Sequence, residues 1–135
     1  MTRANPLSIA LTTLFAAGLL AALPAQATSK QDNAMVNLAN ASGCMTCHHI
    51  DPGAKGPDGL APIGPAWRDV SAKYQGQAGA AKQLTATVLA GSNPYESHWK
   101  GKASGLAMPP NKVAISPTDA GKLVNWILAL PPSPR

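Results

Sequence analysis

Two cysteines separated by two residues and followed at once by a histidine form the part of this sequence best suited to chemistry. The segment reads Cys44-Met45-Thr46-Cys47-His48. This spacing is typical of c-type haem attachment, because each thiol can add to one vinyl group on an edge of the porphyrin and the next residue then lies under the ring. The segment therefore predicts a covalent haem, held through Cys44 and Cys47, with His48 as the proximal iron ligand.

A six-coordinate haem iron needs a second axial ligand, for which a methionine in a loop is the best candidate. Three of the four methionines are poor choices, because they lie in the N-terminal apolar segment, inside the attachment loop or on the apolar face of a predicted helix: Met1, Met45 and Met35. Met108 remains, and Pro109 and Pro110 stiffen the backbone after it. A thioether ligand raises the reduction potential relative to two histidines.

Other arrangements of these residues are open from the sequence. His98 is the main rival as second ligand, whereas His49 adjoins His48 and is expected to point away from the iron. The two cysteines could instead form a disulfide, or they could hold zinc together with His48 and His98. A disulfide leaves His48 without a purpose, and zinc leaves the Met108 loop unexplained, so we favour haem with His48 and Met108 as the iron ligands.

The N-terminal segment, from Met1 to Ala27, has the pattern of a secretory signal. Arg3 supplies a positive charge, residues 7–23 are almost wholly apolar, and Ala25-Gln26-Ala27 fits a small-x-small cleavage site. We expect a cleaved signal peptide over 1–27 and one domain over 28–135, with no stable membrane insertion after cleavage. An uncleaved anchor is the alternative, but the apolar run is shorter than the roughly 20 residues of a spanning helix.

The composition supports a small domain built on a cofactor. Aromatic residues make up only 4% of the chain, which is little for a self-sufficient core, and a haem would supply apolar mass. The formal net charge is +5. This charge is too small and too dispersed to indicate nucleic-acid binding, but it suits docking on acidic protein surfaces.

The hydrophobic pattern predicts an all-α fold. Helices are expected over 32–42, 66–74 and 80–90, and a last helix is expected from 117 to about 130, with Asp32 and Ser116 as N-caps of the first and the last. Residues 28–32 are expected to be a flexible N-terminus. Segments 51–65 and 92–114 are rich in Gly and Pro and predict two long loops, which are long enough to wrap a ligand.

From about residue 35 to residue 130 the chain resembles the class I monohaem cytochromes c of the short bacterial type. The matching pieces are Gly43-Cys44-Met45-Thr46-Cys47-His48, Gly64-Pro65-Ala66-Trp67, Asp69-Val70, Lys73-Tyr74, Gly76-Gln77-Ala78-Gly79-Ala80, Gly91-Ser92, Trp99-Lys100-Gly101, Met108-Pro109-Pro110-Asn111 and Trp126. The resemblance implies a small class I cytochrome c fold, with four to five short helices wrapped around one haem c.

The resemblance also implies roles for individual residues. The carbonyl of Pro65 would accept the Nδ1 proton of His48, Trp99 would direct its indole N–H at a haem propionate, and Asn111 would orient the Met108 loop. Two departures stand out, because loops 49–63 and 92–107 are longer than in the short relatives.

The function implied is electron transfer and not catalysis. The family's members donate electrons to periplasmic reductases and oxidases, so the resemblance implies a periplasmic carrier with protein donors and acceptors. The weak charge argues against a nucleic-acid partner, and a monomer is the default expectation for a small shuttle. Lys55, Lys73, Lys100, Lys102 and Lys112 could form a basic rim for docking. The alternatives are a haem subunit dedicated to one periplasmic oxidoreductase and a ligand-binding haem protein with an open iron position.

Overall fold

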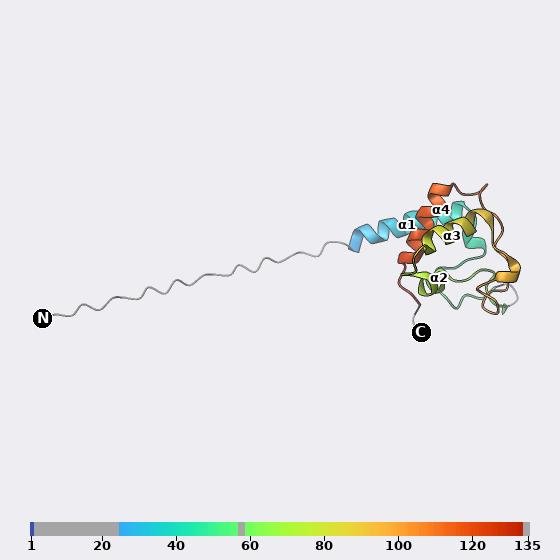
Figure 1. The fold of residues 1–135 in the computed structure, drawn as a ribbon, viewed down its shortest axis with the longest axis horizontal. Helices are drawn as coiled ribbons and strands as arrows, with labels where there is room; N and C mark the ends of the chain where they lie inside the picture. The colour runs from blue at the N-terminus through green and yellow to red at the C-terminus, as the bar shows by residue number, and fades with distance from the viewer. Residues whose placement is uncertain (2–24, 57–58, 134–135) are drawn as a thin grey trace.

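The elements of the domain are helices joined by long loops. A computed structural model describes Met1, residues 25–56 and residues 59–133. Its helices, in chain order, are α1 (Ala25–Ala41), the 3₁₀ helix η1 (Cys44–Thr46), α2 (Trp67–Tyr74), α3 (Ala80–Ala90), the 3₁₀ helix η3 (Pro94–Glu96) and α4 (Pro117–Ala129). In those described ranges the β-structure is limited to an isolated bridge between Lys100 and Ala103. The all-α prediction is confirmed (Figure 1).

Local signals place three of the helices where the sequence predicts them. Ser116 caps α4, since its Oγ accepts a hydrogen bond from the Asp119 N–H at 3.1 Å, and Pro117 occupies the first helical position. Gly91 ends α3 with a φ of 86°, a conformation that L side chains rarely adopt. The predicted bounds of α2, α3 and α4 therefore agree with the structure to within a residue or so.

The start of the first helix differs from its prediction. The sequence predicts a flexible N-terminus over 28–32 and a cap at Asp32, but α1 begins at Ala25 and runs through them. Asp32 does not cap the helix; its Oδ1 accepts a hydrogen bond from the Trp126 indole N–H at 2.7 Å. The segment before Asp32 contains Ala, Gln and Lys, which favour helix, so nothing in its composition stops the helix at a cap.

The N-terminal segment is described only in part. The apolar run predicted as a signal, residues 7–23, lies outside the described residues, and the predicted cleavage site falls in the first turn of α1. In the part of the chain that the structure describes, no helix is long and apolar enough to cross a membrane.

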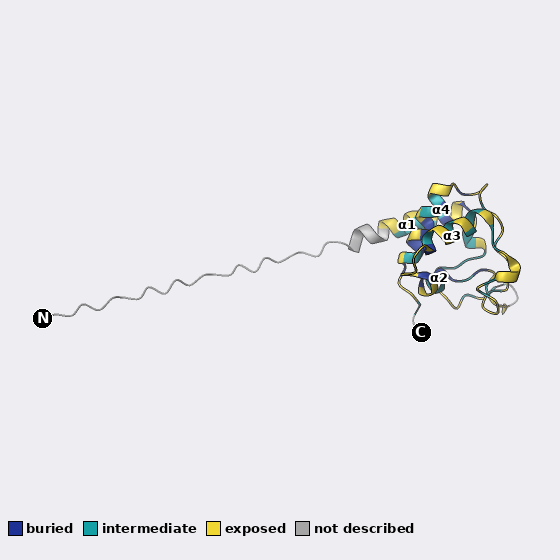
Figure 2. Ribbon diagram, in the orientation of Figure 1, coloured by how far each residue is buried: buried dark blue, intermediate teal, exposed yellow. Residues whose placement is uncertain are grey.

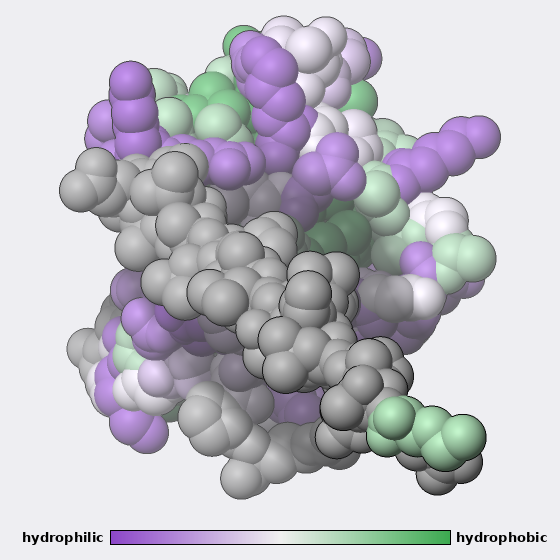
Figure 3. Space-filling model, turned by 90° about the vertical axis from the view of Figure 1, so that its left-hand side faces the viewer, coloured by the Kyte–Doolittle hydropathy of each residue, from purple (hydrophilic) through white to green (hydrophobic). Residues whose placement is uncertain are grey.

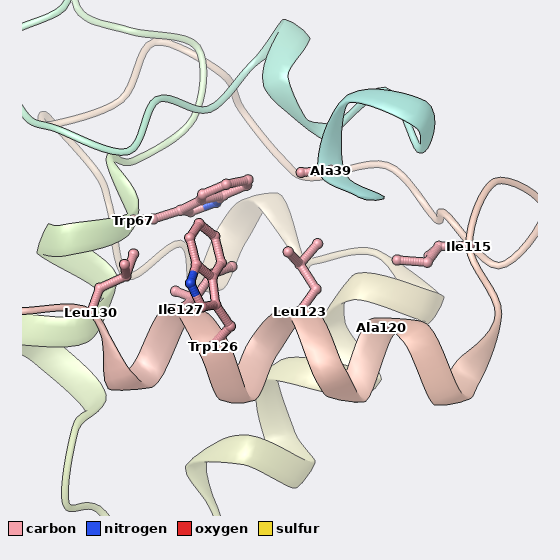
Figure 4. Packing of buried hydrophobic residues seen from close by; sticks show 8 residues of the cluster. All are labelled: Ala39, Trp67, Ile115, Ala120, Leu123, Trp126, Ile127 and Leu130. Carbon is pink, nitrogen blue, oxygen red and sulfur yellow. The ribbon is translucent and has the colours of Figure 1, made fainter. Parts of the chain in front are cut away.

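A hydrophobic core lies where α1, α2 and α3 pack against α4. Its buried residues are Ala39, Trp67, Ile115, Ala120, Leu123, Trp126, Ile127 and Leu130 (Figure 4). The Trp67 and Trp126 rings meet edge to face, 5.7 Å between centroids, a geometry that aromatic pairs prefer. The buried residues of α4 are Ala120, Leu123, Val124, Trp126 and Ile127, and buried, intermediate and exposed residues alternate along the helix (Figure 2).

The outer surface is mixed in character. On the face that Figure 3 shows, hydrophilic residues take much of the visible area and the hydrophobic ones occupy smaller parts of it. Large exposed apolar side chains include Leu60, Leu106 and Val113, of which Leu106 borders the cavity described next.

Candidate functional site

One cavity is lined by all four residues predicted to hold a haem: Cys44, Cys47, His48 and Met108. The space between its walls is about 1080 Å³, counting the part that is open to solvent. The remaining walls are mostly apolar and include Ile63, Trp67, Val70, Leu84, Val88, Leu106, Leu123, Val124 and Ile127. The donor set and the apolar walls therefore fit a haem.

The 3₁₀ helix η1 turns both cysteines toward this cavity. It begins after Gly43, whose φ is 72°, and the Cys47 and His48 N–H groups both donate to the Cys44 carbonyl, at 3.3 and 3.1 Å. Both thiols are free and half-buried, so no disulfide joins them. Burial raises the pKa of the Cys44 thiol. The turn thus presents two unpaired thiols and the following histidine to one space, as haem attachment requires.

The His48 ring is fixed on two sides by the Gly64–Trp67 segment. Its Nδ1 lies 2.8 Å from the Pro65 carbonyl, to which it donates a hydrogen bond, and its ring stacks on Trp67 with 6.0 Å between centroids. Burial lowers the pKa of His48, against the smaller raising effect of the Pro65 carbonyl. The lowered pKa favours the neutral ring, and the bond to Pro65 leaves Nε2 as the nitrogen available to a metal.

Met108 is held through its backbone from the end of α3. Its N–H donates to Ser92 Oγ at 2.8 Å, and the Ser92 N–H donates to the Met108 carbonyl at 2.9 Å. Asn111 donates from Nδ2 to the Pro109 carbonyl at 2.7 Å, and its backbone N–H donates to the Val88 carbonyl at 3.1 Å. Asn111 thus ties the Met108 loop to α3, which is the arrangement that its predicted role requires.

Trp99 lines the same cavity, whereas His98 does not. Lys73 Nζ lies 5.1 Å from the centre of the Trp99 ring and donates to the His98 carbonyl at 3.1 Å. The His98 ring stacks on Tyr74, 6.1 Å between centroids, and its Nδ1 pairs with the Tyr74 hydroxyl. The structure therefore keeps His98 on α2, away from the walls that carry Met108. The contact of Trp99 with a haem propionate stays a prediction.

The zinc alternative finds no support in the side-chain arrangement. Over residues 25–56 and 59–133, no three His, Cys, Asp or Glu side chains gather as a metal-binding group would require. His49 does not line the cavity of His48 and Met108 and instead lines a neighbouring one, in agreement with its predicted orientation.

Several residues that shape the site do so through close backbone packing, which the sequence did not reveal. A Cβ on Gly64 would lie 2.6 Å from His48 Cε1, and one on Gly91 would lie 2.9 Å from the Met108 carbonyl oxygen. Ser92 is a third residue that shapes the site, through its two hydrogen bonds to the Met108 backbone. The sequence marked Gly64, Gly91 and Ser92 as pieces of the family resemblance, with no indication of the contacts that they make.

Comparison with known proteins shows the family. The cytochrome c family profile matches residues 36–131. Cytochrome c-551 of Allochromatium vinosum is 39% identical over 93 residues, which cover 69% of this chain and 82% of that protein. Cytochrome c-552 of Nitrosomonas europaea is 33% identical over 118 residues, covering 87% of this chain and 92% of that protein.

Solved structures agree with these sequence matches. The crystal structure of Nitrosomonas europaea cytochrome c552 superposes with a TM-score of 0.54 at 33% identity, covering 70% of this chain and 98% of that one. A class 1 cytochrome of Sideroxydans lithotrophicus gives the same TM-score, 0.54, at 25% identity, covering 74% of this chain and 96% of that one.

These matches confirm the fold expected from the sequence. The related proteins are electron carriers and not catalysts, and their haem c is bound covalently through a pair of cysteines. Cys44 and Cys47 are the only two cysteines of this chain, and both line the cavity. The chain therefore belongs to the cytochrome c family, as a class I monohaem cytochrome c that binds one haem c through Cys44 and Cys47.

Proposed function

We propose that this cytochrome c is a monomeric periplasmic carrier that moves one electron at a time between donor and acceptor proteins, with His48 and Met108 as the axial ligands. The observation that carries the proposal is the shared cavity, whose walls bring these two side chains together with both cysteines. When bound, the haem supplies a one-electron couple between ferrous and ferric iron.

The protein's part is to hold both ligands in place. The hydrogen bond from His48 Nδ1 to Pro65 fixes the ring orientation and directs Nε2 into the cavity. The paired bonds between Ser92 and Met108 fix the backbone that carries the thioether. Because both ligands are held before any electron moves, little rearrangement accompanies a change of oxidation state. The apolar walls exclude water from the same space.

The ligand assignment is tested by absorption spectra of the oxidised and reduced holoprotein with Met108→Ala. A weak far-red band in the oxidised protein, together with a sharp reduced α-band, is expected of His48 and Met108 ligation, and the far-red band should vanish in the variant. Met45→Leu is the matched control, because Met45 packs against the core and is not a wall of the cavity. A band that survives Met108→Ala would contradict the assignment.

Docking on acidic partners is supported by exposed lysines near the cavity. Lys73 lies over the Trp99 ring, and Lys100 and Lys102 follow Trp99 in the same loop. Attraction between such a surface and a partner's carboxylates is screened by salt. The rate of electron transfer to an acidic partner should therefore fall as ionic strength rises, and rates that ignore ionic strength would count against this docking mode.

Export is tested by the mass of the mature protein. Cleavage after Ala27 would give a holoprotein that begins at Thr28, recovered in the periplasmic fraction with one haem attached. A holoprotein that retains the segment before Thr28 and sediments with membranes would support the anchor alternative.

A further inference from the structure

Two backbone hydrogen bonds join the segment that holds the His48 ring to the segment that precedes Met108. The Ser104 N–H donates to the Pro62 carbonyl at 2.9 Å, and the Gly105 N–H donates to the Ile63 carbonyl at 3.0 Å. We call residues 62–63 and 104–105 the loop clasp. It connects the chain just before Pro65 with the chain just before Met108, two segments that lie far apart in the sequence.

The clasp requires a glycine. A Cβ on Gly105 would lie 2.6 Å from the Ile63 carbonyl oxygen and 3.2 Å from Ile63 Cγ2. The oxygen is a backbone atom and the acceptor of the Gly105 hydrogen bond, so it cannot move without breaking the clasp. Both Ile63 and Gly105 also line the haem cavity. Any larger residue at 105 would therefore separate the two segments at the cavity wall.

The clasp and Ser92 hold the Met108 loop at two different points. Ser92 fixes the Met108 backbone to the end of α3, whereas the clasp fixes the preceding residues to the segment that holds His48. Without the clasp, the residues just before Met108 lose their link to the segment that holds His48, and Met108 can move away from His48 more easily. The clasp also joins loops 49–63 and 92–107, which are the two loops predicted to be longer than in the short relatives.

We propose that the loop clasp is a positioning element that keeps Met108 on the iron by linking its segment to the segment that holds His48. This inference rests on the proposed ligation by His48 and Met108. The clasp acts through Met108, by setting how readily the thioether leaves and admits another ligand.

Gly105→Ala tests the clasp in the holoprotein, with Gly121→Ala as the matched control. Gly121 lies within α4, and a Cβ there meets nothing within 4 Å. Imidazole is titrated into the oxidised proteins, and binding is followed by loss of the far-red band. Because imidazole binds only when Met108 has left, a weaker clasp raises its apparent affinity. Loss of two backbone hydrogen bonds predicts a dissociation constant lowered about tenfold in Gly105→Ala and unchanged in Gly121→Ala.

Amide hydrogen exchange of the wild-type holoprotein tests the same coupling without a variant. The Ser104 and Gly105 amides are expected to exchange slowly and to lose protection when imidazole saturates the iron, since the coupling is reciprocal. Equal imidazole affinity in the two variants would overturn the inference. If Gly105→Ala yields no holoprotein, the exchange experiment decides. The inference would be overturned if imidazole left the protection of the Ser104 and Gly105 amides unchanged. A wild-type protein without the far-red band would instead refute the proposed ligation.

Discussion

The hydrogen bond between Asp32 and Trp126 should contribute measurably to stability, because it joins α1 to α4 across the core. The Trp126 side chain belongs to a residue only 6% exposed, and its Nε1 donates to Asp32 Oδ1 at 2.7 Å. Asp32→Ala would leave that indole N–H without its partner in a region that water reaches poorly. Hydrogen bonds to charged groups contribute about 1.5–3 kcal/mol.

Two effects reduce the expected loss. Asp32 is half-exposed, so water compensates part of the lost bond, and alanine is a better helix former than aspartate by up to about 0.7 kcal/mol. We expect Asp32→Ala to lower the free energy of unfolding by about 1–2 kcal/mol. Asn33→Ala is the control for helix propensity, because Asn33 is the exposed neighbour of Asp32 in α1. This control should leave the free energy of unfolding unchanged or raise it slightly.

Denaturant unfolding of the holoprotein is the assay, combined with Trp126→Phe in a double-mutant cycle. Phenylalanine keeps an aromatic ring against Trp67 but has no N–H, so the cycle isolates the hydrogen bond. A coupling energy of about 1 kcal/mol is expected. A coupling near zero, or equal effects of Asp32→Ala and Asn33→Ala, would refute the reasoning and show that the bond contributes nothing net.

Three further variants test other local interactions. Gly64→Ala should sharply lower the yield of holoprotein relative to wild type, measured by the reduced α-band, because its Cβ would lie 2.6 Å from His48 Cε1; a normal yield would show that the ring can shift. Ser116→Ala removes the cap of α4 and should lower the free energy of unfolding by about 1 kcal/mol, whereas Ser116→Asn should restore most of it. Hydrogen bonding to Lys122 lowers the folded-state pKa of Asp119 below 3.8. The stabilising effect of ionised Asp119 should therefore be present above pH 3.8 and be lost as pH falls through the folded-state pKa. Asp119→Asn should flatten the acidic part of a curve of unfolding free energy against pH, and an unchanged curve would contradict the lowered pKa.

The prediction for Asp32 shows where local sequence signals mislead. A short polar residue before an apolar stripe is typical of an N-cap, but whether it caps depends on the chain before it, which here continues the helix back to Ala25. The partner of Asp32 is Trp126, near the other end of the domain. No local pattern could have paired them, since the contact exists only after α1 and α4 have packed.

The glycines of the two loops show the same limit at the site. The sequence placed Gly64 and Gly105 in the two long loops, and Gly64 in a family motif, but it did not show that each is packed against a group that leaves no room for a Cβ. That group is the His48 ring for Gly64 and the Ile63 carbonyl for Gly105. Close approach of this kind depends on which segments meet in space. Composition therefore predicted the loops but not the clasp that joins them.

The sequence by itself determined the chemistry and the elements. The spacing of Cys44, Cys47 and His48 is a local property of one turn, and the helix ends at Gly91 and Ser116 depend on residues close by in the chain. Tertiary structure alone decided that Met108 shares a cavity with His48 while His98 packs on Tyr74. The physical reason is that two ligands so distant in the sequence are brought together by the packing of α2 and α3 on α4 and by hydrogen bonds between loops, which no short-range pattern specifies.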